Sequence, residues 1–160
     1  MASWKFEGLE EYLSQLKQLK DISRSCIGQA VYSGAGVVAD AMRDAIEALP
    51  IDEKIARNGQ TVHGIGQAQK QGLLDGFGIA KMQDDNGYLH VKLGFDGRNT
   101  VRTPTFPTGQ PNALIARSVN AGTSFRDRIP FIDDTLRQTK KQCEQAMKER
   151  FDEELGKAIE

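Results

Sequence analysis

The chain has 160 residues, of which 27% are charged and 39% hydrophobic, and its formal net charge is -1. This length and composition predict a soluble globular protein with one core. The near-zero charge argues against a global attraction to DNA or to an anionic membrane, and no apolar run approaches the roughly 20 residues of a membrane helix. The polar first residues predict no signal peptide, so we expect folding in the cytoplasm.

The N-terminal part of the chain predicts two helices. The first spans about residues 8–20 and places Leu9, Leu13 and Leu16 at three- and four-residue steps. The second spans about residues 23–49 and ends before a proline, which cannot continue a helix. The second also carries Gly-Ala-Gly at positions 34–36, which lowers helix stability and indicates a close neighbour.

Polar residues and glycines without a clear period fill positions 51–72. They predict a mobile loop, with one short helix near Gln67–Gln71. A hairpin follows, with strands at about 78–83 and 88–95 around Asn86-Gly87, a pair that supplies the positive φ of tight turns. Alternating apolar residues predict one buried face of the second strand: Leu89, Val91, Leu93 and Phe95.

Residues 96–111 contain three prolines and predict a second mobile loop with only irregular or edge structure. A short helix over 112–121 is predicted next, capped by Asn112 and ended by Gly122. The last helix spans about 133–157, with one apolar stripe among charged residues. Together these elements predict a single α+β domain over residues 1–160, in which a short antiparallel sheet packs against long N- and C-terminal helices.

No set of side chains predicts catalysis. The two histidines, His63 and His90, and the two cysteines, Cys26 and Cys143, do not stand at metal-ligand or redox-motif spacing. The glycines do not form a phosphate-binding motif, and paired acids such as Asp84-Asp85 fall in turns or at helix ends. We therefore expect no enzyme, no cofactor and no metal, and two thiols that stay reduced.

Arginines are concentrated between positions 98 and 128. Ordinary solvated side chains with local ion pairs are the simpler interpretation. If a ring of subunits surrounded DNA, however, Arg98, Arg102 and Arg117 could face it. A small bacterial DNA-associated or regulatory protein is therefore the alternative function. The whole group comprises Arg98, Arg102, Arg117, Arg126 and Arg128.

The segment from Leu114 to Leu136 resembles the signature of a family of minor tail components of tailed bacteriophages, which complete the tail or join it to the head. In that family a short helix leads to a Gly-Thr-Ser turn, a basic stretch, and Pro-Phe at the start of a long helix. Residues 72–97 are similar to a Gram-positive phage or prophage branch of the family. The chain departs at Asn120-Ala121, where the family usually has Glu, and in the longer loop 51–72. The matching residues are Gly122, Thr123, Ser124, Arg126, Arg128, Pro130 and Phe131.

The resemblance implies a structural virion protein of a phage or prophage, located in the tail or neck and in the host cytoplasm during assembly. It also implies a ring of several copies, most often six, that contacts tail-tube and head-connector proteins. In isolation the subunit could be a monomer, with both loops ordering only on assembly. From their chemistry alone, the motif residues make a corner between two helices, and subunit contact would be added to that role.

Overall fold

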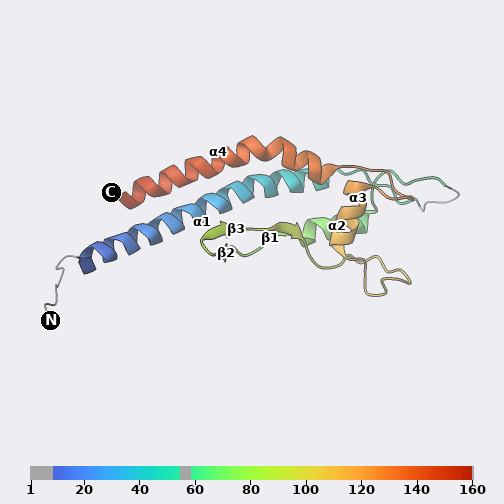
Figure 1. The fold of residues 1–160 in the computed structure, drawn as a ribbon. Helices are drawn as coiled ribbons and strands as arrows, with labels where there is room; N and C mark the ends of the chain where they lie inside the picture. Colours follow the sequence, from blue (N-terminus) through green and yellow to red (C-terminus); the bar gives the residue numbers. More distant parts are fainter. Residues whose placement is uncertain (1–8, 55–58, 160) are drawn as a thin grey trace.

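The computed structural model describes the backbone of residues 9–54 and 59–159. Some of the sequence predictions fall outside this part. They concern the first residue of the expected N-terminal helix, the first residues of the chain, which predict no signal peptide, and positions 55–58 of the first loop. The described part contains four helices and four short strands, which confirms the α+β class. Figure 1 shows the two long helices lying side by side, with the hairpin along one of them and the remaining elements gathered at one end.

The long helices are α1 (Leu9–Glu47) and α4 (Phe131–Ile159), and they run antiparallel. Their register is marked by a hydrogen bond from Arg150 Nη2 to Gln29 Oε1 at 3.0 Å and one from Ser33 Oγ to the Ala146 carbonyl at 3.5 Å. The expectation of two N-terminal helices is wrong, because α1 is a single helix of 39 residues. Gly34 is buried in this helix, and packing there outweighs the low helix propensity of glycine.

Gly34 explains part of the small-residue run in α1. A Cβ at this position would lie 2.4 Å from Met147 Cγ and 3.0 Å from Cys143 Sγ. The expected close neighbour is therefore α4. Gly36 differs, because a Cβ there would meet nothing within 4 Å.

The predicted hairpin exists, but it consists of two strand pairs. β1 (Phe77–Ile79) pairs with β4 (Leu93–Phe95), and β2 (Gln83–Asp85) pairs with β3 (Tyr88–His90), both antiparallel. Between the pairs, three residues on one side oppose two on the other, which is a bulge. The turn is as predicted, with φ of 55° at Asn86 and 94° at Gly87.

The bulge breaks the uniform buried face expected of the second strand. Leu93 and Phe95 pack against the hydrophobic core, whereas Leu89 and Val91 are half-buried outside it. The tip of the hairpin instead lies along α1, where the Met82 amide donates to the Tyr32 hydroxyl at 3.0 Å. Sequence alternation alone does not reveal a bulge, because the extra residue changes the face without changing the composition.

The core lies at the end where all helices meet. Ile46, Ile65, Leu73 and Val119 are each 0% exposed and come from four different segments. Two of them belong to the range 51–72 or its helix, α2, which extends from Gln67 to Gly76 and is longer than expected. Much of this range is therefore packed structure, whereas 96–111 is irregular as expected. Movement of the two loops stays a prediction.

The C-terminal helices agree with the sequence. α3 spans Asn112–Ala121, as expected, and α4 begins at Phe131, two residues before the expected start. The expectation that Asn112 caps α3 is wrong: Pro111 is at the N-cap position, and Asn112 Nδ2 instead donates to the Asp96 carbonyl at 2.8 Å. Within residues 9–54 and 59–159, no helix combines the length and apolar character that crossing a membrane requires.

Candidate assembly surfaces

The Gly-Thr-Ser motif forms the corner between α3 and α4. Gly122 has φ of 75° and ends α3. Thr123 and Arg126 then exchange two backbone hydrogen bonds of 2.9 and 3.3 Å, closing a four-residue turn. The Thr123 hydroxyl also accepts from the Phe125 amide at 3.3 Å. These contacts fit the role expected from the residues themselves.

The corner ends where α4 enters the core. The Pro130 carbonyl accepts from the Asp134 amide at 2.9 Å, as at the beginning of a helix. Phe131 is 5% exposed, and its ring lies edge-on to that of Phe95 with centroids 6.3 Å apart. Phe131 thus anchors α4 on the core, in agreement with its position in the motif at the start of the long helix.

Asn120, one of the two residues that depart from the family pattern, caps α4 from the end of α3. Its Oδ1 accepts from the amides of Ile132 at 3.0 Å and Asp133 at 3.2 Å. Arg128 Nε donates to the Asn120 carbonyl at 3.2 Å, and its Nη2 lies 3.3 Å from Asp133. The sequence did not reveal this cap, because the residue precedes the helix it caps by more than ten positions.

Arg126 lies inside the molecule. The residue is 8% exposed, and its Nη2 donates to Gln69 Oε1 at 3.2 Å. Its Nε and Nη1 are buried without a hydrogen-bond partner, and burial lowers the pKa of the guanidinium. The backbone of this segment pairs with Val62, so Arg126 joins the corner to α2 and to the preceding segment. Its guanidinium therefore does not present a charge to the surface.

Besides Arg128, the exposed part of the motif is the tip of the turn. Thr123 and Ser124 are exposed there, together with Phe125, which is 51% exposed. Phe125 was not among the residues singled out from the sequence. A single phenylalanine is usually a core residue, so the sequence carried no signal for its position.

The arginines expected to face DNA are at the surface. Arg102 and Arg117 are exposed, and exposed Arg98 donates from Nη1 to the Gly109 carbonyl at 2.9 Å. The other two members of the group are engaged within the corner, Arg126 by burial and Arg128 by Asp133. The DNA-facing role of the three exposed arginines stays a prediction.

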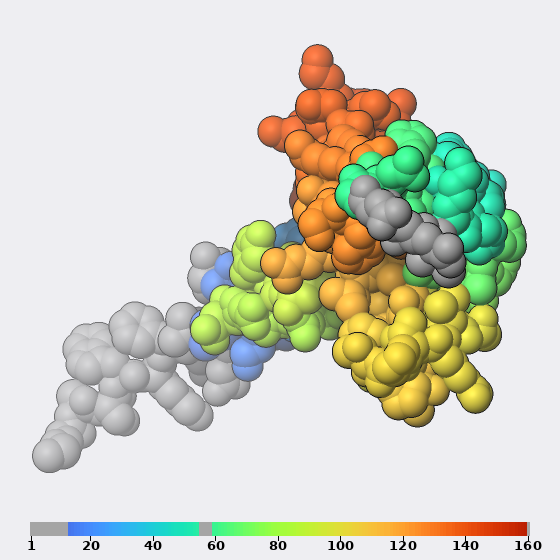
Figure 2. Space-filling view, turned by 90° about the vertical axis from the view of Figure 1, so that its right-hand side faces the viewer, coloured from blue at the N-terminus to red at the C-terminus, as the bar shows by residue number. Residues whose placement is uncertain are grey.

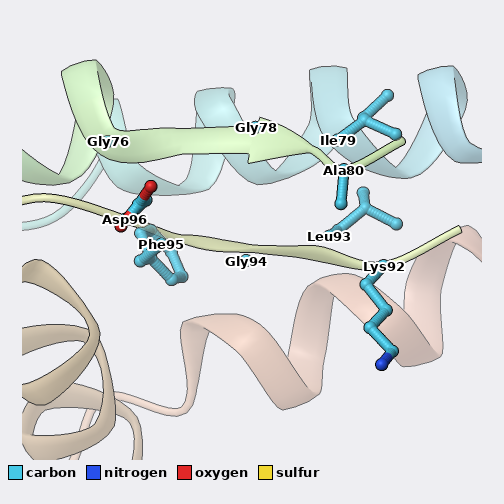
Figure 3. Close-up of a pocket in the computed structure, with 9 residues that line it drawn as sticks. All are labelled: Gly76, Gly78, Ile79, Ala80, Lys92, Leu93, Gly94, Phe95 and Asp96. Atoms are coloured by element: carbon cyan, nitrogen blue, oxygen red, sulfur yellow. The ribbon is translucent and has the colours of Figure 1, made fainter.

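A notch lies over the β1–β4 strand pair. Gly78 and Gly94 are directly opposite each other, and a Cβ at either would meet nothing within 4 Å. Figure 3 shows Ile79, Ala80 and Leu93 toward one end of this pair and Phe95 and Asp96 toward the other, with bare backbone between. The notch has a volume of about 370 Å³ and is lined only by the two strands and their ends.

Apolar side chains are also exposed on several elements. Figure 2 looks along the molecule toward its loop end, where residues 96–111 (yellow) form a lobe and the hairpin (yellow-green) projects sideways. Three exposed leucines lie close together on the first turns of α1. The exposed large apolar side chains are Leu13, Leu16, Leu19, Ile27, Tyr32, Ile51, Tyr88, Leu114, Phe125, Leu136 and Ile159.

Among the described residues, no group of three His, Cys, Asp or Glu side chains could hold a metal ion. His63 Nδ1 lies 3.4 Å from Asp127 Oδ2, and the Asp127 amide donates to the Val62 carbonyl at 2.9 Å. Asp52 has a lowered pKa, chiefly because its carboxylate accepts from the Lys54 amide. The Asp52 carboxylate holds backbone in place, since it also accepts from the His63 amide at 3.2 Å.

Comparison of the chain with protein-family models, with curated proteins and with solved structures returned no match.

Proposed function

We propose that this chain is a structural subunit of a tailed phage or prophage that completes the tail or joins it to the head. Its copies form a ring that contacts tail-tube and head-connector proteins. The resemblance of the Leu114–Leu136 segment supports the proposal. The fold supplies contact surfaces in keeping with such a role: a corner with an exposed aromatic tip, and a hairpin with unpaired strand edges.

The observation that carries the proposal is the glycine pair of the hairpin. Glycine weakens a strand, and it is usually retained where φ is positive or where another atom leaves no room for a Cβ. Neither reason applies at Gly78 or Gly94. Strand glycines also occur at bulges, but the bulge of this hairpin begins after Ile79, beyond the glycine pair. Close approach of another chain is therefore the reason that we favour for the two facing glycines.

The strand edges make the same region suitable for a subunit contact. In the described part of the chain, β1 pairs only with β4, so each strand has an edge without a strand neighbour. Such edges accept further backbone hydrogen bonds from another chain. A neighbouring subunit could therefore approach the glycine pair and continue the pairing at one edge.

Light scattering on the full chain tests the proposal, first alone over a wide concentration range and then with the tail-tube and connector proteins of the same phage. We expect discrete assemblies of several copies to form when the protein is concentrated or meets those partners. Gly94→Val should abolish them, because its side chain fills the notch. Its thermal stability should be unchanged or higher, since the added Cβ has open space and valine favours strands.

Gly156→Ala is the matched control, because it also adds a Cβ into open space but lies near the C-terminal end of α4. It should assemble like the wild type. Assembly of Gly94→Val at wild-type concentrations would exclude the notch as a contact. If the chain does not bind tail and connector proteins but binds duplex DNA with steep salt dependence, the alternative function, a DNA-associated or regulatory protein, would be favoured.

A further inference from the structure

The buried arginine of the corner has more hydrogen-bond donors than partners. Arg126 Nη2 donates to Gln69, whereas Nε and Nη1 lack a partner among the described residues. Both ends of the Gln69 amide are already engaged, because its Nε2 donates to Gln110 Oε1 at 2.7 Å and its Oε1 also accepts from the Gly66 amide at 3.2 Å. This network orients the guanidinium and leaves two of its nitrogens without an acceptor.

Arg126 lines a cleft of about 350 Å³ beside the corner. Clefts of this size hold small organic molecules in other proteins. Part of the lining is apolar and consists of Val62, Val101 and the half-exposed Phe125. The cleft therefore places an apolar surface next to a buried guanidinium.

The charge of this guanidinium is not balanced within the described part of the chain. Arg126 forms no ion pair there, and burial lowers its pKa without a neighbouring carboxylate to offset the effect. Asp52 and Glu53 line the same cleft, but their carboxylates accept from backbone amides. A buried charge without a counter-charge is costly, so an anionic group from outside the chain would stabilise this one.

The lining selects the kind of anion. A guanidinium presents planar N–H donors that match the oxygens of a carboxylate or a phosphate. The other charged residues of the lining are two acids and one base, Asp52, Glu53 and Lys54, with a net charge of -1. They repel a phosphate dianion more strongly than a singly charged carboxylate. The apolar side chains favour a carboxylate attached to a short apolar group.

We propose that the cleft binds a carboxylate carried on a short apolar group, with its oxygens at the Arg126 guanidinium and its apolar part against Val101 and Phe125. Nε and Nη1 are shielded from solvent, so the ligand reaches them as half-exposed Phe125 turns aside. A free organic acid and the C-terminal residue of another chain share this chemistry. The cleft shares no lining residue with the notch of the hairpin, so the site is independent of the proposed phage role.

NMR titration of the full chain at constant ionic strength tests the site. The probes are isovalerate for a free acid and N-acetyl-leucine for a C-terminal residue, and isovaleramide is the uncharged control. We expect saturable shifts of the Phe125 and Arg126 amide signals with either carboxylate, at a Kd of about 10 mM or below, and none with isovaleramide. Tighter binding of N-acetyl-leucine would identify a C-terminal residue as the ligand, and tighter binding of isovalerate would identify a free acid.

Variants test the assignment of the residues. Arg126→Met should weaken binding of the better probe by about tenfold or more, because charge-assisted hydrogen bonds are lost. Arg128→Met is the matched control, since Arg128 is an exposed arginine outside the cleft, and its affinity should match the wild type. Far-UV circular dichroism checks that each variant folds. If Arg126→Met does not fold, Phe125→Ala decides, because removing this half-exposed side chain should weaken binding by about threefold or more.

Four results would overturn the proposal. They are the absence of saturable binding by both carboxylates, equal binding of isovaleramide, tighter binding of inorganic phosphate, and an unchanged affinity in folded Arg126→Met or in Phe125→Ala. Gly94→Val should bind the probes like the wild type, because Gly94 lies on the hairpin outside the cleft. Failure of this site and failure of the proposed assembly are therefore distinguishable.

Discussion

Alanine substitutions at Gly34 and Gly36 should shift stability in different directions, although both positions lie in the middle of α1. Replacing a glycine inside a helix by alanine stabilises the helix by about 1 kcal/mol. At Gly36 nothing lies within 4 Å of the added Cβ, so this gain should appear in full. For a chain of this length it corresponds to a rise in Tm of about 2–4 °C.

At Gly34 the same change meets α4. The added Cβ would lie 2.4 Å from Met147 Cγ, a carbon near the start of that side chain, and 3.0 Å from Cys143 Sγ. Overpacking of this kind costs about 1–3 kcal/mol, so the net effect should range from neutral to a loss of about 2 kcal/mol. Gly34→Ala should therefore fall about 1–3 kcal/mol below Gly36→Ala in the free energy of unfolding.

Urea unfolding followed by circular dichroism at 222 nm measures this difference. Combining Gly34→Ala with Met147→Ala should show a coupling energy, because the second change removes the atoms that the new Cβ meets. Equal stabilisation by Gly34→Ala and Gly36→Ala would refute the close approach of α1 and α4 at this point. Additive effects in the double variant would show that Met147 is not the neighbour responsible.

Three further expectations concern single contacts. Asn120→Ala should lower the free energy of unfolding by about 1–2 kcal/mol, since two amides at the start of α4 lose their acceptor, and an unchanged urea midpoint would contradict the cap. Gln69→Leu should lower it by about 1.5–3 kcal/mol, because the buried Arg126 and the Gly66 amide lose their acceptor. Adding Arg126→Met should recover the part of that loss that comes from the unpaired charge, and a double variant as unstable as the single one would argue against such a penalty. Burial and the nearby Glu144 raise the pKa of the Cys143 thiol, so its thiolate fraction at pH 8 is small. Iodoacetamide should therefore modify Cys143 more slowly in the folded chain than in urea, and equal rates would refute the raised pKa.

Several local elements could be read from the sequence because their causes lie within a few residues. Asn86 and Gly87 provide the two positive φ angles of a tight turn. Gly122 ends α3 where the sequence placed its end. The α+β class followed from these elements and from the long amphipathic stretches at both ends of the chain.

Helix continuity, burial and the hydrogen-bond partners of long side chains depend on tertiary contacts. The glycines at 34 and 36 do not interrupt α1, and the neighbour that packs against Gly34 is Met147 of α4, more than a hundred positions away. The sequence places Arg126 in a group of solvated arginines, whereas in the fold Arg126 is buried and donates to Gln69. Asn120 became a cap only because α3 and α4 meet at a turn. Sterics and backbone hydrogen bonds between neighbours are encoded locally, whereas burial and the partners of long side chains depend on segments that folding brings together.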